Sequence, residues 1–224
     1  MTATRKSILV ESVDPQDHIV FIVDDDRRIR EALSDLLSSV DMHAVTFGSA
    51  AEYLAYPRPD IPACLVLDVE LPDINGLDLQ SQIAEGNHPQ IVFITGRGDI
   101  PSSVRAIKSG AVDFLTKPFK EADLMRAINA ALDQSRDARR KRGELADLHR
   151  RLSSLTPREQ EVLPLVVSGL LNKQAAAELG ISEVTLQIHR GNIMKKMGAG
   201  SLAELVRIAG ALEIPITHSR HSQR

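Results

Sequence analysis

Four groups of polar side chains stand directly after apolar runs of the sequence. Asp24 and Asp25 follow one run, and Asp68 ends another. Thr95 ends a third run, and Lys117 follows a fourth. Carboxylates that lie close together raise one another's pKa unless a cation neutralises them, and sets of oxygen ligands suit hard divalent ions, above all Mg²⁺. With a hydroxyl and an ammonium beside them, these residues have the chemistry to hold Mg²⁺ and a phosphoryl group, whose transfer depends on positioning and charge neutralisation.

The segments that carry these residues alternate between two hydrophobic patterns. Short continuous apolar runs are typical of strands buried on both faces of a parallel sheet. We expect five such strands, at residues 18–23, 43–47, 64–68, 91–95 and 112–116. Helical spacing of apolar residues follows each strand, at residues 29–40, 50–54, 77–84, 102–109 and from 121 onward. This order predicts an α/β domain with a doubly wound, parallel five-stranded sheet.

In such a sheet, functional groups gather beyond the carboxyl ends of the strands. For any one Asp, the plain alternative is a carboxylate that only caps its strand end. Separate strand ends have no reason to supply matching groups, so the whole set favours a site. Asp26 is better explained as a solvated carboxylate at the start of a helix. The sequence has no GxxxxGK[ST] loop and no G-x-G-x-x-G turn after the first strand, which excludes a P-loop or dinucleotide site there.

The last third of the chain carries helix signals alone. Thr156 to Glu159 form a capping box with Pro at the first helical position, and we expect a helix to about residue 169, kinked at Pro164. Further helices are expected at 172–179, at 183–197 after Ser182, and at 202–212 after a second capping box at Ser201 and Glu204. The middle two have the dimensions of a helix-turn-helix. The second of them offers amide and basic side chains for the major groove, although a surface helix with solvated charges has the same pattern.

Between the two halves, helical spacing continues from residue 121 to about 152. Gly143 weakens it by about 1 kcal/mol relative to Ala. Residues 135–144 are strongly charged, which fits a solvated helix, a coiled-coil spacer or a flexible linker.

Composition separates the two halves as well. Residues 1–135 carry 12 basic and 21 acidic residues, whereas residues 136–224 carry 15 and 9, so the second half is the one suited to nucleic acid.

A single Cys64 excludes a disulfide framework and a multi-cysteine zinc site, and it fits a reducing cytoplasm. We find no membrane span and no signal peptide, and the 3% aromatic content argues against base-stacking platforms.

The segments 21–26, 67–79, 93–99 and 113–119 read FIVDDD, LDVELPDINGLDL, FITGRGD and DFLTKPF. In order and spacing, residues 18–133 resemble the receiver domain of response regulators. The resemblance implies that Asp68 accepts a phosphoryl group, and that Mg²⁺ is held by Asp24, Asp25 (the favoured direct ligand), Asp68 and the backbone carbonyl of Glu70. It implies that Thr95 and Lys117 stabilise the phosphoryl group and that Phe114 is the switch aromatic. It also implies a cis Lys117–Pro118 bond and makes Glu70 and Arg97 candidates for tuning phosphoryl lifetime.

Residues 155–163, 172–197 and 202–208 resemble the LuxR-type helix-turn-helix, so that residues 18–212 together resemble response regulators of the NarL/FixJ class. The resemblance makes 183–197 the recognition helix of an all-α four-helix domain. The candidate DNA contacts are Lys173, Thr185, Gln187, Ile188, Arg190, Gly191, Asn192 and Lys195. Gly191 and Pro164 depart from the commoner residues of the family. We therefore divide the chain into a tail (1–17), a receiver domain (18–133), a helical linker (134–152), a DNA-binding domain (153–213) and a second tail (214–224).

The resemblance implies a cytoplasmic transcriptional regulator of a two-component system, which catalyses no reaction beyond its own phosphorylation and dephosphorylation. Its expected partners are a sensor histidine kinase, double-stranded promoter DNA, a second copy of the chain on activation and, as a further candidate, RNA polymerase. Three alternatives stay open. They are a LuxR-type regulator controlled by a small ligand, an aspartate-based phosphatase with Glu70 at the D-x-D position, and an orphan regulator that works without phosphate.

Overall fold

The computed structural model describes residues 18–83, 88–96 and 100–215. Within them the chain divides into two compact units, with the boundary between Arg139 and Arg140. The predicted helix at 77–84 and the two predicted tails extend beyond the described residues, as does Arg97.

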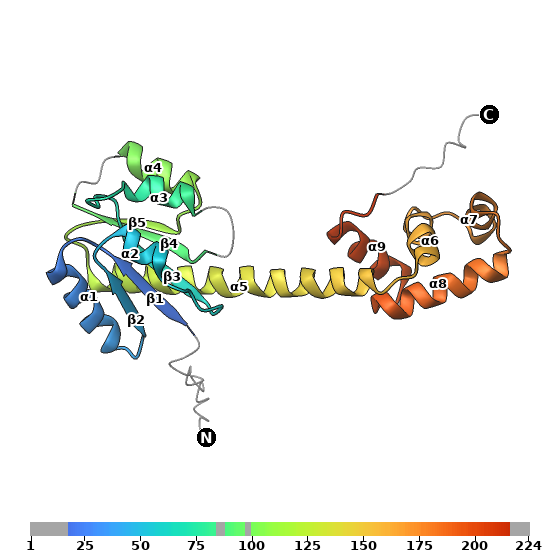
Figure 1. The fold of residues 1–224 in the computed structure, drawn as a ribbon, viewed down its shortest axis with the longest axis horizontal. Helices are drawn as coiled ribbons and strands as arrows, with labels where there is room; N and C mark the ends of the chain where they lie inside the picture. Colours follow the sequence, from blue (N-terminus) through green and yellow to red (C-terminus); the bar gives the residue numbers. More distant parts are fainter. Residues whose placement is uncertain (1–17, 84–87, 97–99, 216–224) are drawn as a thin grey trace, which may run out of the picture. The chain divides into compact units, whose positions relative to one another are not determined.

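The first unit is built on one parallel sheet in the order β2-β1-β3-β4-β5 (Figure 1). The strands are β1 (Ile19–Val23), β2 (Ala44–Phe47), β3 (Ala63–Asp68), β4 (Gln90–Thr95) and β5 (Asp113–Thr116). The helices that follow them are α1 (Arg27–Ser38), α2 (Ala50–Ala55), α3 (Gly76–Gln82), α4 (Ile100–Lys108) and α5 (Glu121–Ser153). The predicted doubly wound α/β fold is confirmed, and each strand lies within one residue of its expected bounds.

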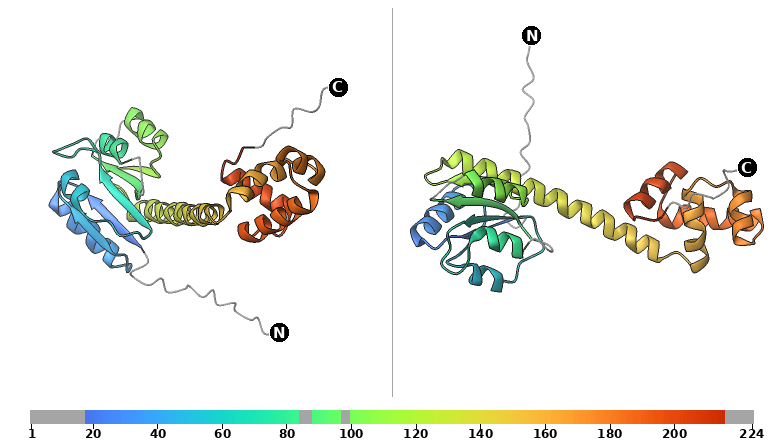
Figure 2. Two further views of the ribbon diagram at one scale, coloured as in Figure 1. Left: turned by 45° about the vertical axis from the view of Figure 1, so that its right-hand side comes forward. Right: turned by 90° about the horizontal axis from the view of Figure 1, so that it is seen from above.

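Two hydrophobic cores explain why the strand sequences are continuously apolar. One core joins alternate strand residues such as Phe21 and Phe93 to α2, α3 and α4. The other joins the intervening residues such as Ile22 to α1 and α5, on the opposite face of the sheet (Figure 2). A strand covered on both faces has no solvent side, so alternation with polar residues is absent. Cys64 lies in the second core, where burial raises the pKa of its thiol and keeps it unreactive.

Helix α5 is continuous over 33 residues, which identifies the charged stretch around Gly143 as helix. At its start, α5 belongs to the first unit, where the Ser135 hydroxyl accepts a hydrogen bond of 3.1 Å from the Ala63 N–H. At its end, Leu148 and Leu152 pack on the core of the second unit. This packing at both ends compensates for the low helix propensity of Gly143.

The second unit adds helices α6 (Pro157–Val167), α7 (Asn172–Leu179), α8 (Glu183–Met197) and α9 (Leu202–Ala211). The capping box at Thr156 is present as predicted. The second box forms only in part, because Glu204 accepts from the Gly200 N–H at 2.9 Å and not from Ser201. Pro164 does not interrupt α6, whose neighbouring residues Val162, Leu163, Leu165 and Val166 are all buried.

None of the helices in the described ranges has both the length and the apolar character needed to cross a membrane.

Candidate functional site

The parallel register brings the predicted residues to one edge of the sheet. Asp68 is the last residue of β3 and pairs with Ile94, next to Thr95 at the end of β4. Thr95 pairs with Thr116, and the Lys117 N–H donates to the Thr95 carbonyl at 2.7 Å. Asp24 follows β1, the strand on the other side of β3.

Lys117 joins two carboxylates at this edge. Its Nζ donates to Asp24 Oδ2 and to Asp68 Oδ2, each at 2.6 Å. The side chain of Asp24 is fully buried, and that of Asp68 is 8% exposed. One ammonium therefore faces two buried carboxylates, and the local charge stays negative while both are ionised.

The pKa values reflect this crowding. Burial raises the pKa of Asp24 above its ordinary value, and it outweighs the hydrogen bonds from Lys117 and from the Asp26 N–H, which act in the opposite direction. Burial alone would lower the pKa of Lys117, but its hydrogen bonds to Asp24 and Asp68 raise it. Lys117 is thus charged at neutral pH.

Asp24, Asp25 and Asp68 form the predicted acidic cluster. One carboxylate oxygen from each lies within 4.8 Å of the others, as the ligands of a single ion do. A set of hard oxygen donors beside a single ammonium fits Mg²⁺, whose sites use one or two carboxylates and several waters. Asp26 takes no part in the cluster, because its carboxylate caps α1 by accepting from the Arg28 N–H at 2.8 Å. The interpretation of Asp26 as a helix-start residue is confirmed.

The loops around Asp68 explain several features of its segment. Asp68 Oδ1 accepts from the Glu70 N–H at 3.0 Å, so the backbone of Glu70 lies beside the cluster. A Cβ on Gly76 would lie 2.4 Å from the Asp68 carbonyl oxygen, which only glycine avoids. The Lys117–Pro118 bond is cis, as the receiver resemblance implied.

Thr95 and Phe114 occupy neighbouring strands beyond this cluster. Thr95 is fully buried. Phe114 is half-buried, and its ring lies 6.1 Å from that of Phe93, on the face of the sheet covered by α2 to α4.

Two residues of this edge were missed by sequence reasoning. Arg30 Nη1 donates to the carbonyl oxygens of Asp24 and Asp25, at 2.7 and 3.0 Å. The Asp73 carboxylate accepts from the N–H of Ala51 at 2.9 Å and so caps α2 from another loop. The backbone hydrogen bonds hold the pKa of Asp73 below its usual range, although burial acts against them. Neither contact follows from a sequence pattern, since the Arg30 contact depends on how its side chain turns back to the preceding loop and the Asp73 contact joins loops that are separate in sequence.

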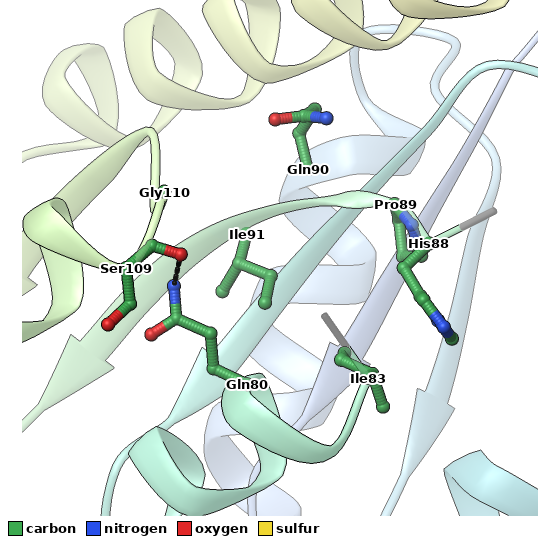
Figure 3. Close-up of a pocket in the computed structure, with 8 residues that line it drawn as sticks. All are labelled: Gln80, Ile83, His88, Pro89, Gln90, Ile91, Ser109 and Gly110. Atoms are coloured by element: carbon green, nitrogen blue, oxygen red, sulfur yellow. Dashed lines mark hydrogen bonds between the residues drawn. The ribbon is translucent and has the colours of Figure 1, made fainter. Parts of the chain in front are cut away.

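A cavity of about 200 Å³ lies at the other end of β4, beside Gln90 (Figure 3). Its lining residues are Gln80, Ile83, His88, Pro89, Gln90, Ile91, Ser109 and Gly110. Gln80 Nε2 donates to the carbonyl oxygens of Ala106 and Ser109, at 3.2 and 3.0 Å, and so ties α3 to the end of α4. None of the predicted site residues lines this cavity. The better candidate site is the acidic edge of the sheet, formed by Asp24, Asp25 and Asp68 with Lys117.

In the second unit, α8 presents one open face. Val184 and Ile188 are 69% and 60% exposed. The same helix and the start of α7 expose most of the predicted DNA contacts, namely Lys173, Gln187, Ile188, Gly191, Asn192 and Lys195. The other two are half-buried and have partners within the domain. The Thr185 hydroxyl lies 2.8 Å from that of Ser182, and Arg190 Nη1 donates to Asn172 Oδ1 at 3.1 Å.

The opposite face of α8 is fixed. Leu186, Ile193 and Met197 are fully buried in the domain core. Lys196 Nζ donates to Glu159 Oε2 at 2.7 Å and to the Ser154 carbonyl at 3.2 Å. The ammonium of Lys196, together with the Thr156 N–H, holds the pKa of Glu159 below its usual range.

Comparisons with known proteins agree with both units. The family model described as "Response regulator receiver domain" matches residues 20–129, and "Bacterial regulatory proteins, luxR family" matches residues 153–209. The chain is 50% identical to Nodulation protein W of Bradyrhizobium diazoefficiens, over 92% of this chain and 91% of that protein. It is 41% identical to the transcriptional regulatory protein FixJ of Azorhizobium caulinodans, over 87% of this chain and 93% of FixJ.

Among solved structures, the response regulator StyR is similar with a TM-score of 0.76 and 46% identity, covering 87% of this chain and 98% of StyR. Full-length FixJ from B. japonicum has a TM-score of 0.51 and 36% identity, covering 89% of this chain and 98% of FixJ.

Proposed function

The chain belongs to the response regulators of the NarL/FixJ class, which join a receiver domain to a LuxR-type helix-turn-helix, and on this premise we propose that phosphorylation of Asp68 controls its binding to promoter DNA. The observation that carries the proposal is the pairing of Asp68 with Lys117 beside Asp24 and Asp25 at the carboxyl edge of the sheet.

In the proposed reaction, a carboxylate oxygen of Asp68 attacks the phosphorus of a phosphohistidine on the partner kinase. An O–P bond forms, the N–P bond breaks, and the imidazole leaves with its electron pair. Lys117 is within 2.6 Å of Asp68 Oδ2 and is placed to move from the carboxylate to a phosphoryl oxygen. The hydroxyl of Thr95, at the end of the neighbouring strand, donates a hydrogen bond to another phosphoryl oxygen.

The residues that would hold Mg²⁺ are Asp24, Asp25 and Asp68, with the carbonyl of Glu70 as a fourth protein ligand. Bound there, Mg²⁺ supplies positive charge that offsets the phosphoryl oxygens. The contribution of the chain is to hold the carboxylate oxygens in place. Hydrogen bonds from the Asp26 N–H and from Lys117 fix the Asp24 carboxylate, and one from the Glu70 N–H fixes that of Asp68.

The proposed switch starts at Thr95 and Phe114. When Thr95 turns toward the phosphoryl group, the half-buried ring of Phe114 moves into the space beside it. This change reaches the surface at α4, which exposes Ile100, Val104 and Ile107 by 79%, 44% and 48%. These residues are spaced by four and three, so they share one helix face, and we assign that face to a second copy of the chain.

In the second unit, α8 is proposed to enter the major groove. The amides of Gln187 and Asn192 are suited to base edges, and Lys195 and Lys173 to phosphates. A dimer would place two such helices on a two-fold-related site.

Intact mass measurement tests the phosphorylation step. Incubation with acetyl phosphate and Mg²⁺ is expected to add one phosphoryl group to the wild type and none to Asp68→Asn. Asp78→Asn, which changes an exposed acid on α3, is the matched control and is expected to gain the same mass as the wild type. An equal gain in wild type and Asp68→Asn would place the acceptor elsewhere.

A further inference from the structure

We propose that Arg30 is a positioning residue for the divalent cation site, holding the backbone of Asp24 and Asp25 so that both carboxylates face Asp68. The inference rests on the Mg²⁺ site proposed above and assigns a role to a residue outside its ligand set.

The contact is specific to the segment that carries the acids. Arg30 is the fourth residue of α1, and its side chain returns to the loop between β1 and α1. A single nitrogen, Nη1, donates to two successive carbonyl oxygens, Asp24 O at 2.7 Å and Asp25 O at 3.0 Å. Two peptide groups held by one rigid guanidinium cannot rotate independently.

The two acids depend on this contact to different degrees. The carboxylate of Asp24 also accepts hydrogen bonds from the Asp26 N–H at 2.9 Å and from Lys117 at 2.6 Å. Asp25 is exposed, and the hydrogen bond from Arg30 to its carbonyl oxygen fixes the backbone that carries its side chain. We therefore expect the direction of the Asp25 carboxylate to depend most on Arg30.

The guanidinium is itself confined. The position of a Cβ on Gly48 would lie 3.6 to 3.7 Å from Nη1, Cζ and Nη2 of Arg30, so the group lies against the loop between β2 and α2. Its hydrogen bonds go to carbonyl oxygens, which leaves the carboxylate oxygens of the cluster for a cation.

Positioning and charge predict opposite signs. If Arg30 acted only as a nearby positive charge, its removal would lessen repulsion and strengthen Mg²⁺ binding. If it positions the ligands, its removal weakens binding, as the loss of outer-sphere partners does. A purely structural role would lower stability without changing the affinity for Mg²⁺.

The test uses the full-length chain and three variants, Arg30→Met, Arg30→Lys and Arg27→Met. Arg27 lies on the same helix, has an 82% exposed side chain and pairs with Glu31 at 2.7 Å, so Arg27→Met removes the same charge without touching the loop. Isothermal titration calorimetry gives the Kd for Mg²⁺, and thermal melts with and without Mg²⁺ separate folding from binding.

We expect Arg30→Met to weaken Mg²⁺ binding about tenfold, Arg30→Lys to recover part of the loss, and Arg27→Met to stay within about twofold of the wild type. Unchanged or tighter binding by Arg30→Met would overturn the positioning role, including the case in which its melting temperature alone falls. If the wild type itself binds no Mg²⁺, the proposed cation site fails, and the role of Arg30 fails with it.

Discussion

The acidic edge of the first unit and the open face of α8 in the second are built in opposite ways. At the acidic edge, Asp24 and Asp68 are buried and bonded to Lys117 at 2.6 Å. On α8, Val184 and Ile188 point outward and are more than half exposed. A site that performs chemistry needs its groups held in position before the substrate arrives. A surface that recognises another molecule keeps its side chains exposed until that partner contacts them.

Among the substitutions considered, removal of the Lys117 ammonium is expected to have the largest effect on the buried acidic edge. Lys117→Met leaves two buried carboxylates without their cation, and we expect it to lower the free energy of unfolding of the first unit by about 3 kcal/mol without Mg²⁺. Both tyrosines of the chain, Tyr53 and Tyr56, lie in this unit and there is no Trp, so tyrosine fluorescence in urea reports on it selectively.

Mg²⁺ is expected to restore part of the stability of Lys117→Met, because a cation then binds the same carboxylates. Lys120→Met, which changes an exposed lysine three residues further along the chain, serves as a control with the same charge change. Equal stability of Lys117→Met and the wild type without Mg²⁺ would mean that the edge is not held together by this ion pair.

Gly76→Ala changes the same region through shape alone. The added methyl would lie 2.4 Å from the Asp68 carbonyl oxygen, so backbone must shift, and we expect a loss of about 2 kcal/mol by the same tyrosine signal. Gly96→Ala is the control, since a Cβ there meets nothing within 4 Å. Similar losses in both variants would contradict the close approach at Gly76.

The ion pair of Glu159 and Lys196 gives the corresponding measurement in the second unit. Its contribution is smaller, about 1 kcal/mol, because Lys196 is 34% exposed and solvent screens the pair. The folded-state pKa of Glu159 is lowered, so this stability is present above the unfolded value of about 4.3 and is lost as pH falls through the folded value.

Circular dichroism melts of wild type and Glu159→Gln between pH 7 and pH 3 test this dependence. The difference between the two proteins should be largest near neutrality and vanish in acid. A difference that grows as the pH falls would have the wrong sign for a lowered pKa.

Gly191→Ala has the smallest expected effect on folding and acts in the opposite direction. A Cβ at this position in α8 meets nothing within 4 Å, so alanine should stabilise the helix by about 0.5 to 1 kcal/mol. We expect weaker binding to duplex DNA, because the methyl group enters the face proposed to approach the base edges. Fluorescence anisotropy with a labelled duplex measures this, and unchanged affinity would remove Gly191 from the groove-facing set.

Much of the fold could be predicted because its signals are local. The runs that became β1, β3 and β4 are continuously apolar, and α7 and α8 have the predicted bounds because Gly180 and Ser182 mark their ends. The sequence predicts helices through Gly143 (α5) and Pro164 (α6), although it leaves the charged stretch around Gly143 open between a helix and a flexible linker. Local signals could not decide this, because tertiary packing on the cores outweighs the local cost of Gly143 and Pro164. The strand-end acids were visible in the sequence, whereas the bonds from Arg30 depend on loop geometry that no spacing encodes.

The central claim, that phosphorylation of Asp68 controls DNA binding by α8, is tested most directly by one affinity measurement. A duplex selected from a random pool is titrated with the full-length protein, with and without acetyl phosphate and Mg²⁺, beside Asp68→Asn. We predict that phosphorylation tightens binding of the wild type about tenfold and leaves Asp68→Asn unchanged. Equal affinity of phosphorylated and unphosphorylated wild type would contradict the account.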